Sequence, residues 1–126
     1  MDMSEVLPHH PESKPFFTAL GAGKFLIKHC RACARPHWYP RALCPHCFSP
    51  DTEWREASGK GQIYSYSVSR TVTEPYAVAY VTLAEGPTMM TRLTETDFSK
   101  ISIGARVTLD IRPAEDGTPL PFFKLT

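Results

Sequence analysis

The sequence predicts a mainly β protein that consists of a short N-terminal helix, a Cys₄ zinc ribbon and a five-stranded OB-fold barrel. Two observations lead to this fold class. All four cysteines fall into two Cys-x-x-Cys pairs, a spacing typical of a ribbon that binds one metal ion. From residue 58 onward, short apolar segments alternate with turn residues, and no amphipathic helix interrupts them. We therefore expect a lead-in and helix over residues 1–22, the ribbon over 23–57 and the barrel over 58–126.

The composition is that of an ordinary globular protein. Hydrophobic residues make up 42% of the 126 residues and charged residues 21%, and the formal net charge is +1. The longest apolar runs, such as residues 77–81, are far too short to span a bilayer, and the N-terminus has neither the basic region nor the apolar core of a signal peptide. We expect a soluble cytoplasmic protein with no membrane association.

A short helix is predicted shortly after the N-terminus. Residues 1–12 are expected to form a poorly ordered lead-in. Ser13 is a candidate N-cap, and Pro15 is tolerated in a first helical turn. The apolar residues that follow share one face, and a glycine can end the helix after two turns; they are Phe16, Phe17, Leu20 and then Gly21 or Gly23. Because so short a helix is not stable alone, its apolar face must pack either on its own chain or on a partner.

The cysteine pairs are the clearest chemical signal in the chain. Each pair forms a tight turn that presents two thiolates, and the short loop between the pairs brings the turns together around one tetrahedral ion. Four thiolates leave no open position for water, so the predicted zinc is structural. A rubredoxin-type iron site uses the same ligands and stays open at this point. The predicted metal ligands are Cys30, Cys33, Cys44 and Cys47.

Other uses of the cysteines fit less well. Without an export signal, two disulfides are disfavoured, and a thioredoxin-like site needs one pair at a helix N-terminus in a βαβ setting, which this chain lacks. Histidines flank the cysteines at His29, His37 and His46. Since the four cysteines already complete the ligand count, we expect these histidines to lie around the site or on the surface.

Positive charge is concentrated around the predicted ribbon. Residues 13–50 hold six Lys and Arg and no acid, whereas the remainder from Asp51 holds ten acidic and eight basic residues. A Cys₄ zinc site contributes about −2, which leaves residues 13–50 near +4. A basic surface attracts polyanions, although solubilising surface residues would look the same. The candidate polyanion-binding residues are Lys24, Lys28, Arg31, Arg35 and Arg41.

Five strands are expected after the flexible joint at Ser58 to Gly61. Tyr64, Tyr66 and Val68 alternate with serines as in a half-buried strand, and the next segment is apolar on both faces. The predicted strands cover about residues 64–69, 77–83, 88–93, 107–112 and 120–125. Closing such strands into a barrel removes exposed edges. The OB-fold is the commonest five-stranded solution, and an SH3-like barrel remains the alternative.

Several motifs together resemble a known family. They are Pro15-Phe16-Phe17, Cys30-Arg31-Ala32-Cys33, Tyr39-Pro40-Arg41, Cys44-Pro45-His46-Cys47, Ser58-Gly59-Lys60-Gly61-Gln62-Ile63-Tyr64-Ser65, Glu85-Gly86-Pro87 and Gly104-Ala105-Arg106-Val107. The chain resembles the acyl-CoA-associated OB-fold proteins with a rubredoxin-like zinc ribbon, catalogued as domain of unknown function number thirty-five. The glycine-rich joint directly after the ribbon, followed by Glu-Gly-Pro, is the most specific of these features.

The resemblance implies a non-catalytic accessory subunit that carries one structural zinc. Members of this family accompany thiolase-superfamily enzymes, including thiolases, acyltransferases and retro-aldolases of lipid and steroid metabolism, and are implied to stabilise the partner and to bind or pass on the CoA thioester. The basic residues of the ribbon are candidates for the CoA phosphates. Thr88 stands where family members often have a basic residue, which weakens a phosphate site at that turn. The apolar candidates for the partner interface are Phe16, Phe17, Trp38 and Tyr39.

Two other function classes are weaker. An OB-fold with a zinc ribbon can bind single-stranded nucleic acid by stacking bases on aromatics, here Tyr64, Tyr66, Tyr76 and Tyr80. The sequence pI of about 7.7 argues against this, because such binders usually exceed about 9. An enzyme that acts alone is disfavoured because no nucleophile elbow, zinc-protease motif, phosphate loop or carboxylate pair is recognisable.

Overall fold

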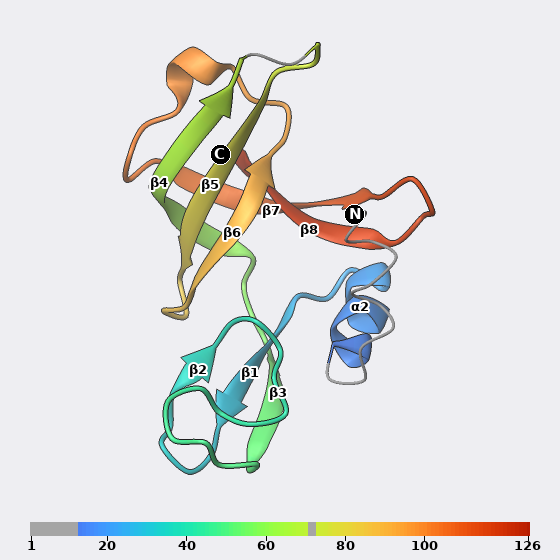
Figure 1. Cartoon of the computed structure of the whole chain (residues 1–126), viewed down its shortest axis with the longest axis vertical. Coiled ribbons are helices and arrows are strands. Elements are labelled where there is room, and N and C mark those ends of the chain that lie inside the picture. Colours follow the sequence, from blue (N-terminus) through green and yellow to red (C-terminus); the bar gives the residue numbers. More distant parts are fainter. Residues whose placement is uncertain (1–12, 71–72) are drawn as a thin grey trace. The chain divides into compact units, whose positions relative to one another are not determined.

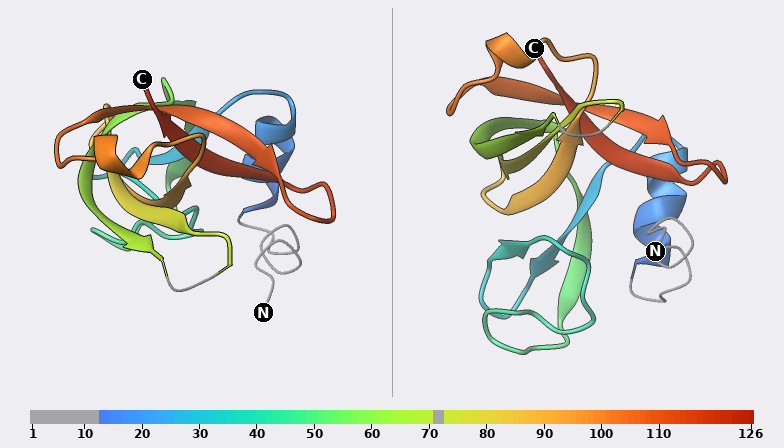
Figure 2. Two further views of the ribbon diagram at one scale, coloured as in Figure 1. Left: turned by 90° about the horizontal axis from the view of Figure 1, so that it is seen from above. Right: turned by 45° about the horizontal axis from the view of Figure 1, so that its top comes forward.

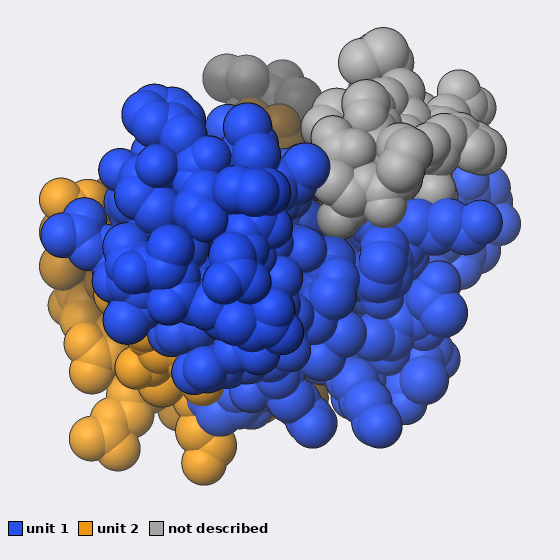
Figure 3. Space-filling view, turned by 90° about the horizontal axis from the view of Figure 1, so that it is seen from below, with its two compact units in different colours: residues 1–58, 111–120 blue, residues 59–110, 121–126 orange. Residues whose placement is uncertain are grey.

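The computed structural model describes residues 13–70 and 73–126, which divide into two compact units. Unit 1 comprises residues 1–58 and 111–120, and unit 2 comprises residues 59–110 and 121–126 (Figure 3). Unit 1 holds the helix and the cysteine-bearing sheet. Most of the barrel lies in unit 2. Within the described residues, no helix is long and apolar enough to cross a membrane.

The predicted N-terminal helix is confirmed as α2 (Lys14–Gly21). Ser13 takes the N-cap position, although its side chain makes no capping hydrogen bond, and a proline lies in the first turn. At the other end the N–H of Gly23 donates to the carbonyl oxygen of Leu20 at 3.0 Å. Gly23 has a φ of +85°, a conformation that a residue with a Cβ adopts only with strain. The helix therefore ends just before Gly23, where the chain turns toward the next strand.

The apolar face of α2 packs within unit 1. Phe16 and Leu20 are each 1% exposed. The ring of Phe16 meets three other rings edge-on, with centroid distances of 5.1 Å to Phe17, 5.9 Å to Phe25 and 5.0 Å to Trp38. Burying an aromatic side chain contributes a few kcal/mol. The sequence left open whether this helix packs on its own chain or on a partner. In the structure it packs on its own chain.

The cysteines lie on and beside a three-stranded antiparallel sheet. Its strands are β1 (Leu26–Cys30), β2 (Pro36–His37) and β3 (Thr52–Glu56), in the order β2-β1-β3. Strand β1 leads into the first cysteine pair and ends at Cys30. Strand β3 was not predicted from the sequence, and it pairs with β1 over its full length, from Leu26 opposite Glu56 to Cys30 opposite Thr52.

The five-stranded barrel predicted from the sequence is confirmed. It consists of β4 (Lys60–Ser69), β5 (Tyr76–Leu83), β6 (Thr88–Leu93), β7 (Arg106–Pro113) and β8 (Pro119–Leu125), closed in the order β4-β5-β6-β8-β7 (Figures 1 and 2). Strands β6 and β8 pair in parallel, and the other reported pairings are antiparallel. The short 3₁₀ helix η2 (Phe98–Lys100) connects β6 to β7. This is the Greek-key arrangement of an OB-fold.

One strand departs from the alternation read from the sequence. In β4 the pairing with β5 shifts register between Ile63 and Ser65, so Tyr64 has no partner in the ladder and is 68% exposed. Such a bulge changes which residues face inward. Two residues after Tyr64, beyond the shift, Tyr66 pairs with Ala79, which is buried.

The barrel should tolerate no side chain at Gly61. A Cβ at this position would lie 2.6 Å from Cγ1 of Val81 and 2.8 Å from the carbonyl oxygen of Thr82. We expect Gly61→Ala to lower the free energy of unfolding by about 1–3 kcal/mol, as overpacking does, in urea titrations followed by circular dichroism. The matched control is Gly21→Ala, where the nearest atom is 3.9 Å away. Equal stability of the two variants would contradict the packing described here.

Candidate metal centre

Two turns of the same local structure hold the four cysteines. In each turn the N–H of the first cysteine donates to a carbonyl oxygen five residues later, from Cys30 to Arg35 at 2.9 Å and from Cys44 to Ser49 at 3.0 Å. The residue after each second cysteine has a positive φ, +60° at Ala34 and +64° at Phe48. The repeated Cys-x-x-Cys motif thus produces a repeated backbone conformation, and both turns direct their thiols to one point.

The four sulfurs form a cluster with the dimensions of a tetrahedral metal site. All four Sγ atoms lie within 4.8 Å of one another. The Sγ atoms of Cys30 and Cys47 are 3.6 Å apart, and those of Cys33 and Cys44 are 3.7 Å apart. A tetrahedron with metal–sulfur bonds of about 2.3 Å has edges of about 3.8 Å. The predicted ligand set therefore fits one metal ion, and none of the four cysteines forms a disulfide.

The hydrogen bonds and burial of the turns make the thiols unequally acidic. Burial raises the pKa of Cys33 to about 12. Burial also opposes ionisation of Cys44, but hydrogen bonds from the backbone N–H groups of Cys47 and His46 outweigh it and lower the pKa of Cys44 to about 7. The N–H of His46 lies 3.3 Å from Sγ of Cys44. A metal ion that binds all four thiolates must displace protons that the free thiols otherwise keep.

The flanking histidines are outside the ligand cluster, which contains only cysteines among the described residues. His37 is 3% exposed, and neither ring nitrogen has a hydrogen-bond partner among those residues. Its pKa is lowered, first by burial and then by the positive charges of His46, Lys28 and Arg41. A neutral imidazole therefore packs inside the ribbon. The sequence showed His37 near the site but not its burial.

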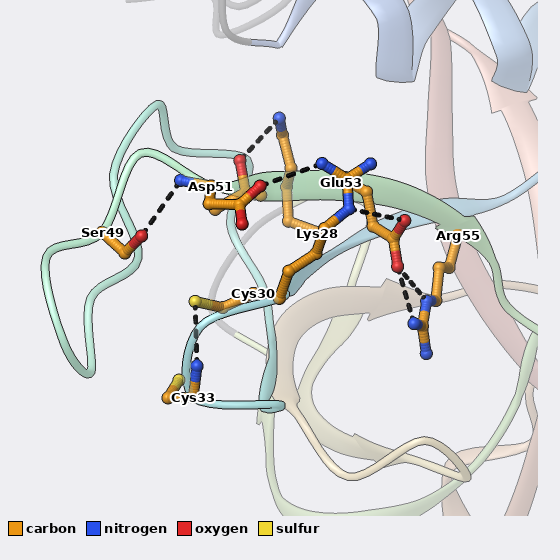
Figure 4. A network of polar contacts seen from close by, with 9 residues as sticks. Lys28, Cys30, Cys33, Ser49, Asp51, Glu53 and Arg55 are labelled. Atoms are coloured by element: carbon orange, nitrogen blue, oxygen red, sulfur yellow. Dashed lines mark hydrogen bonds and ion pairs between the residues drawn. The ribbon is translucent and has the colours of Figure 1, made fainter.

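Two of the five candidate polyanion-binding residues already have partners within the ribbon. Arg31 forms ion pairs with Asp51 at 2.9 Å and with Glu53 at 3.2 Å, and Figure 4 labels these two acidic residues. Nζ of Lys28 lies 4.5 Å from the centroid of the Trp54 ring and donates to Oγ1 of Thr52 at 3.3 Å. These partners come from β3 and the residue before it, which the sequence analysis did not assign to the sheet.

The acidic residues from Asp51 to Glu56, which the charge estimate for residues 13–50 left out, lower the charge of the ribbon. Residues 23–57 contain six basic and three acidic side chains. With four thiolates and one divalent ion, which add about −2, the ribbon carries about +1 rather than the +4 estimated for residues 13–50. The basic candidates outside these contacts are Lys24, Arg35 and Arg41, and all three are exposed.

The four apolar interface candidates lie in different environments. Phe16 and Phe17 are 1% and 8% exposed and belong to the core of unit 1, while Trp38 and Tyr39 are half-buried and joined by a cis peptide bond. Two more exposed apolar side chains near the cysteines, Leu43 and Phe48, were not predicted from the sequence. Both line a hollow of about 470 Å³ beside Cys44, together with Tyr39, Arg41 and Pro45.

A Cys₄ ribbon followed by a closed Greek-key barrel defines a ribbon-and-OB-fold protein, and family models identify the family. The model described as "ChsH2, rubredoxin-like zinc ribbon domain" matches residues 17–53, and that described as "ChsH2, C-terminal OB-fold domain" matches residues 54–112. The chain belongs to the ChsH2/DUF35 family. This confirms the predicted family, and it favours the OB-fold over the SH3-like alternative.

Curated relatives support the same assignment. A "DUF35 domain-containing scaffold protein" of Methanothermobacter thermautotrophicus is 34% identical over 94 residues, which cover 69% of this chain and 71% of the relative. A "Probable enoyl-CoA hydratase alpha subunit" of Thermomonospora curvata is 38% identical over 114 residues and 86% of this chain. The match covers only 36% of that relative, so the chain corresponds to about a third of its length.

Two solved structures share the fold. A chain of the "Ltp2-ChsH2(DUF35) aldolase" superposes with a TM-score of 0.79 and 36% identity, covering 92% of this chain and 95% of that one. A DUF35-family protein of unknown function from Sulfolobus solfataricus superposes with a TM-score of 0.71 and 18% identity, covering 99% of this chain and 95% of that one. The second likeness concerns the fold alone.

Removing one thiol from each turn should abolish metal binding. We expect the double variant Cys33→Ser, Cys44→Ser to lose the bound metal, about one ion per wild-type chain, when metal content is measured by inductively coupled plasma mass spectrometry. The variant should also lose ordered structure in the ribbon, because metal binding supplies much of the stability of so small a module. Wild-type metal content in the variant would contradict the four-cysteine site.

Burial of neutral His37 should make the ribbon less stable in acid. The pKa of His37 is lowered in the folded protein, so the unfolded chain binds the proton more readily, and stability is lost as pH falls below about 6.5. We expect His37→Leu to lose less stability than the wild type between pH 7.5 and pH 5.5 in urea titrations. Both chains keep all four metal-binding thiols, so their difference isolates His37. Identical losses would exclude this effect.

Proposed function

We propose that this chain is a non-catalytic, zinc-binding accessory subunit of a thiolase-superfamily enzyme that acts on acyl-CoA thioesters. The observation that carries the proposal is its match, over nearly the full length of both chains, to a chain of the Ltp2-ChsH2(DUF35) aldolase. The names of two relatives, a scaffold protein and a subunit of an enoyl-CoA hydratase, point the same way. We infer that the chain stabilises a partner subunit that performs the chemistry.

Zinc is the proposed metal. Four thiolates in a tetrahedral arrangement suit zinc and also iron, and the matching ribbon model carries the name of a zinc ribbon. The four cysteines would fill every coordination position, leaving none for a water or a substrate. The metal would therefore act on folding rather than on a substrate. Paired cysteines that form no disulfide are typical of a reducing compartment, which supports a cytoplasmic location.

Contact with CoA is a further part of the proposal. Its phosphates would be bound by the exposed basic residues Lys24, Arg35 and Arg41 rather than by Arg31, whose guanidinium already pairs with two carboxylates. The exposed apolar residues Leu43 and Phe48 lie beside Arg41 in the same hollow and offer a surface for the adenine ring or the acyl portion.

Co-expression tests the accessory role. The tagged chain is expressed with each thiolase-superfamily protein encoded in the same genome, and complexes are isolated by affinity purification and gel filtration. We expect one of these proteins to co-elute stoichiometrically, with zinc in the complex. We also expect the isolated chain to show no turnover of acyl-CoA substrates, and the partner to lose activity or solubility when it is expressed alone.

The controls separate this role from its alternatives. The Cys33→Ser, Cys44→Ser variant should fail to co-elute, because the ribbon no longer folds. Elution of wild-type chain and every enzyme as separate proteins, together with tight binding of single-stranded DNA or RNA at physiological salt, would contradict the proposal and favour the nucleic-acid alternative. Zinc protein is colourless, so a visible Fe(III)–thiolate absorption band would show that the bound metal is iron.

A further inference from the structure

The outer face of the barrel sheet formed by β4, β5 and β6 has an unusual composition. The three strands lie side by side in a curved layer (Figures 1 and 2). Positions on β5 alternate between buried residues such as Ala79 and Val81 and residues on the other side of the sheet. The pairing registers assign the outer face to Lys60, Gln62, Ser65, Ser67, Ser69, Tyr76, Val78, Tyr80, Thr82, Thr88, Met90 and Arg92.

The centre of this outer face is apolar and accessible. Tyr80 on β5 pairs directly with Met90 on β6, and the two side chains are 47% and 61% exposed. Ser65 lies opposite Tyr80 on the other side, immediately after Tyr64 at the register shift. Because these exposed tyrosine and methionine side chains are adjacent, they form one continuous apolar patch, unlike single apolar residues scattered over a surface.

Negative charge is absent from the outer face. Of its twelve residues, all of which the structure describes, Lys60 at the start of β4 and Arg92 are the charged side chains, and none is acidic. The Arg92 guanidinium lies 4.2 Å from the centroid of the Tyr76 ring, which holds it over the sheet. A sheet face that only meets water usually carries charges of both signs. Tyrosine, methionine and arginine are instead the residues enriched in the centre of protein interfaces, where lysine and acids are depleted.

We propose that the outer face is a docking surface for the enzyme subunit. The enzyme subunit contributes an apolar patch that packs over Tyr80 and Met90, and a carboxylate that pairs with Arg92. This inference rests on the proposed function and assigns the subunit contact to a particular surface. A second copy of this chain fits less well, because two copies of the same face would bring two Arg92 side chains and no carboxylate. Single-stranded nucleic acid fits less well because two cations neutralise few phosphates.

The test compares acidic substitutions on and off the outer face in the co-purified complex. Met90→Glu is expected to weaken subunit affinity about 30-fold or more, as for an interface residue of central importance. The matched control is Ile103→Glu, since Ile103 is 73% exposed in the same unit and lies between η2 and β7. It should change affinity by less than about threefold. Affinity is measured by surface plasmon resonance, and circular dichroism and zinc content establish that both variants fold.

A photo-crosslinking residue gives an independent readout. Benzoylphenylalanine at position 80 should form a covalent adduct with the enzyme subunit, and the same residue at position 103 should not. Unchanged affinity of Met90→Glu and no adduct from position 80, in a complex that the wild type still forms, would overturn this inference while leaving the accessory role intact. A wild-type chain that binds no enzyme subunit would overturn both.

Two further outcomes would identify a different occupant. A concentration-dependent dimer of the isolated chain in analytical ultracentrifugation, lost in Met90→Glu, would assign the outer face to a second copy. Binding of a fluorescent oligothymidine, lost in Tyr80→Ala, would assign it to nucleic acid. Each of these results would contradict docking of the enzyme subunit.

Discussion

The tetrahedral arrangement of four cysteine sulfurs is the constraint on which unit 1 depends. Two turns that are separated along the chain bring their thiols to within 4.8 Å of one another. Without a metal, four thiolates at this spacing would repel one another. The sheet that holds them consists of only three short strands and cannot fix their positions alone. A module of this size buries too little apolar surface to fold unaided. The metal and the aromatic cluster around Phe16 therefore both stabilise unit 1.

The same constraint supports the proposal that the chemistry belongs to another chain. A site with four thiolate ligands has no position for a substrate or a water. Around it, the charges of the ribbon are largely compensated, with Arg31 held by Asp51 and Glu53. What remains for recognition is surface: exposed basic side chains, the hollow beside Cys44 and the outer face of the barrel, which carries no acidic residue. These features suit a protein that binds a partner.

Much of this architecture could be predicted from sequence because its signals are local. The cysteine spacing, the proline and glycine that bound α2, and the alternating strands each act within a few residues. Strand β3 was missed because its pairing with β1 joins residues more than twenty positions apart, and the acids that neutralise Arg31 were missed with it. The exposure of Tyr64 follows from a register shift in β4, which depends on packing against β5 and leaves no pattern in the sequence.

Hydrogen exchange with and without metal tests the dependence of unit 1 on its metal site most directly. The chain is stripped with a chelator under reducing conditions, and peptide-level deuterium uptake is compared with that of the zinc-loaded protein. The account predicts that β1, β2 and β3 lose their protection without metal while β5 and β6 keep theirs. Equal protection of β1 to β3 in the two forms would show that the ribbon folds without its metal and would contradict the account.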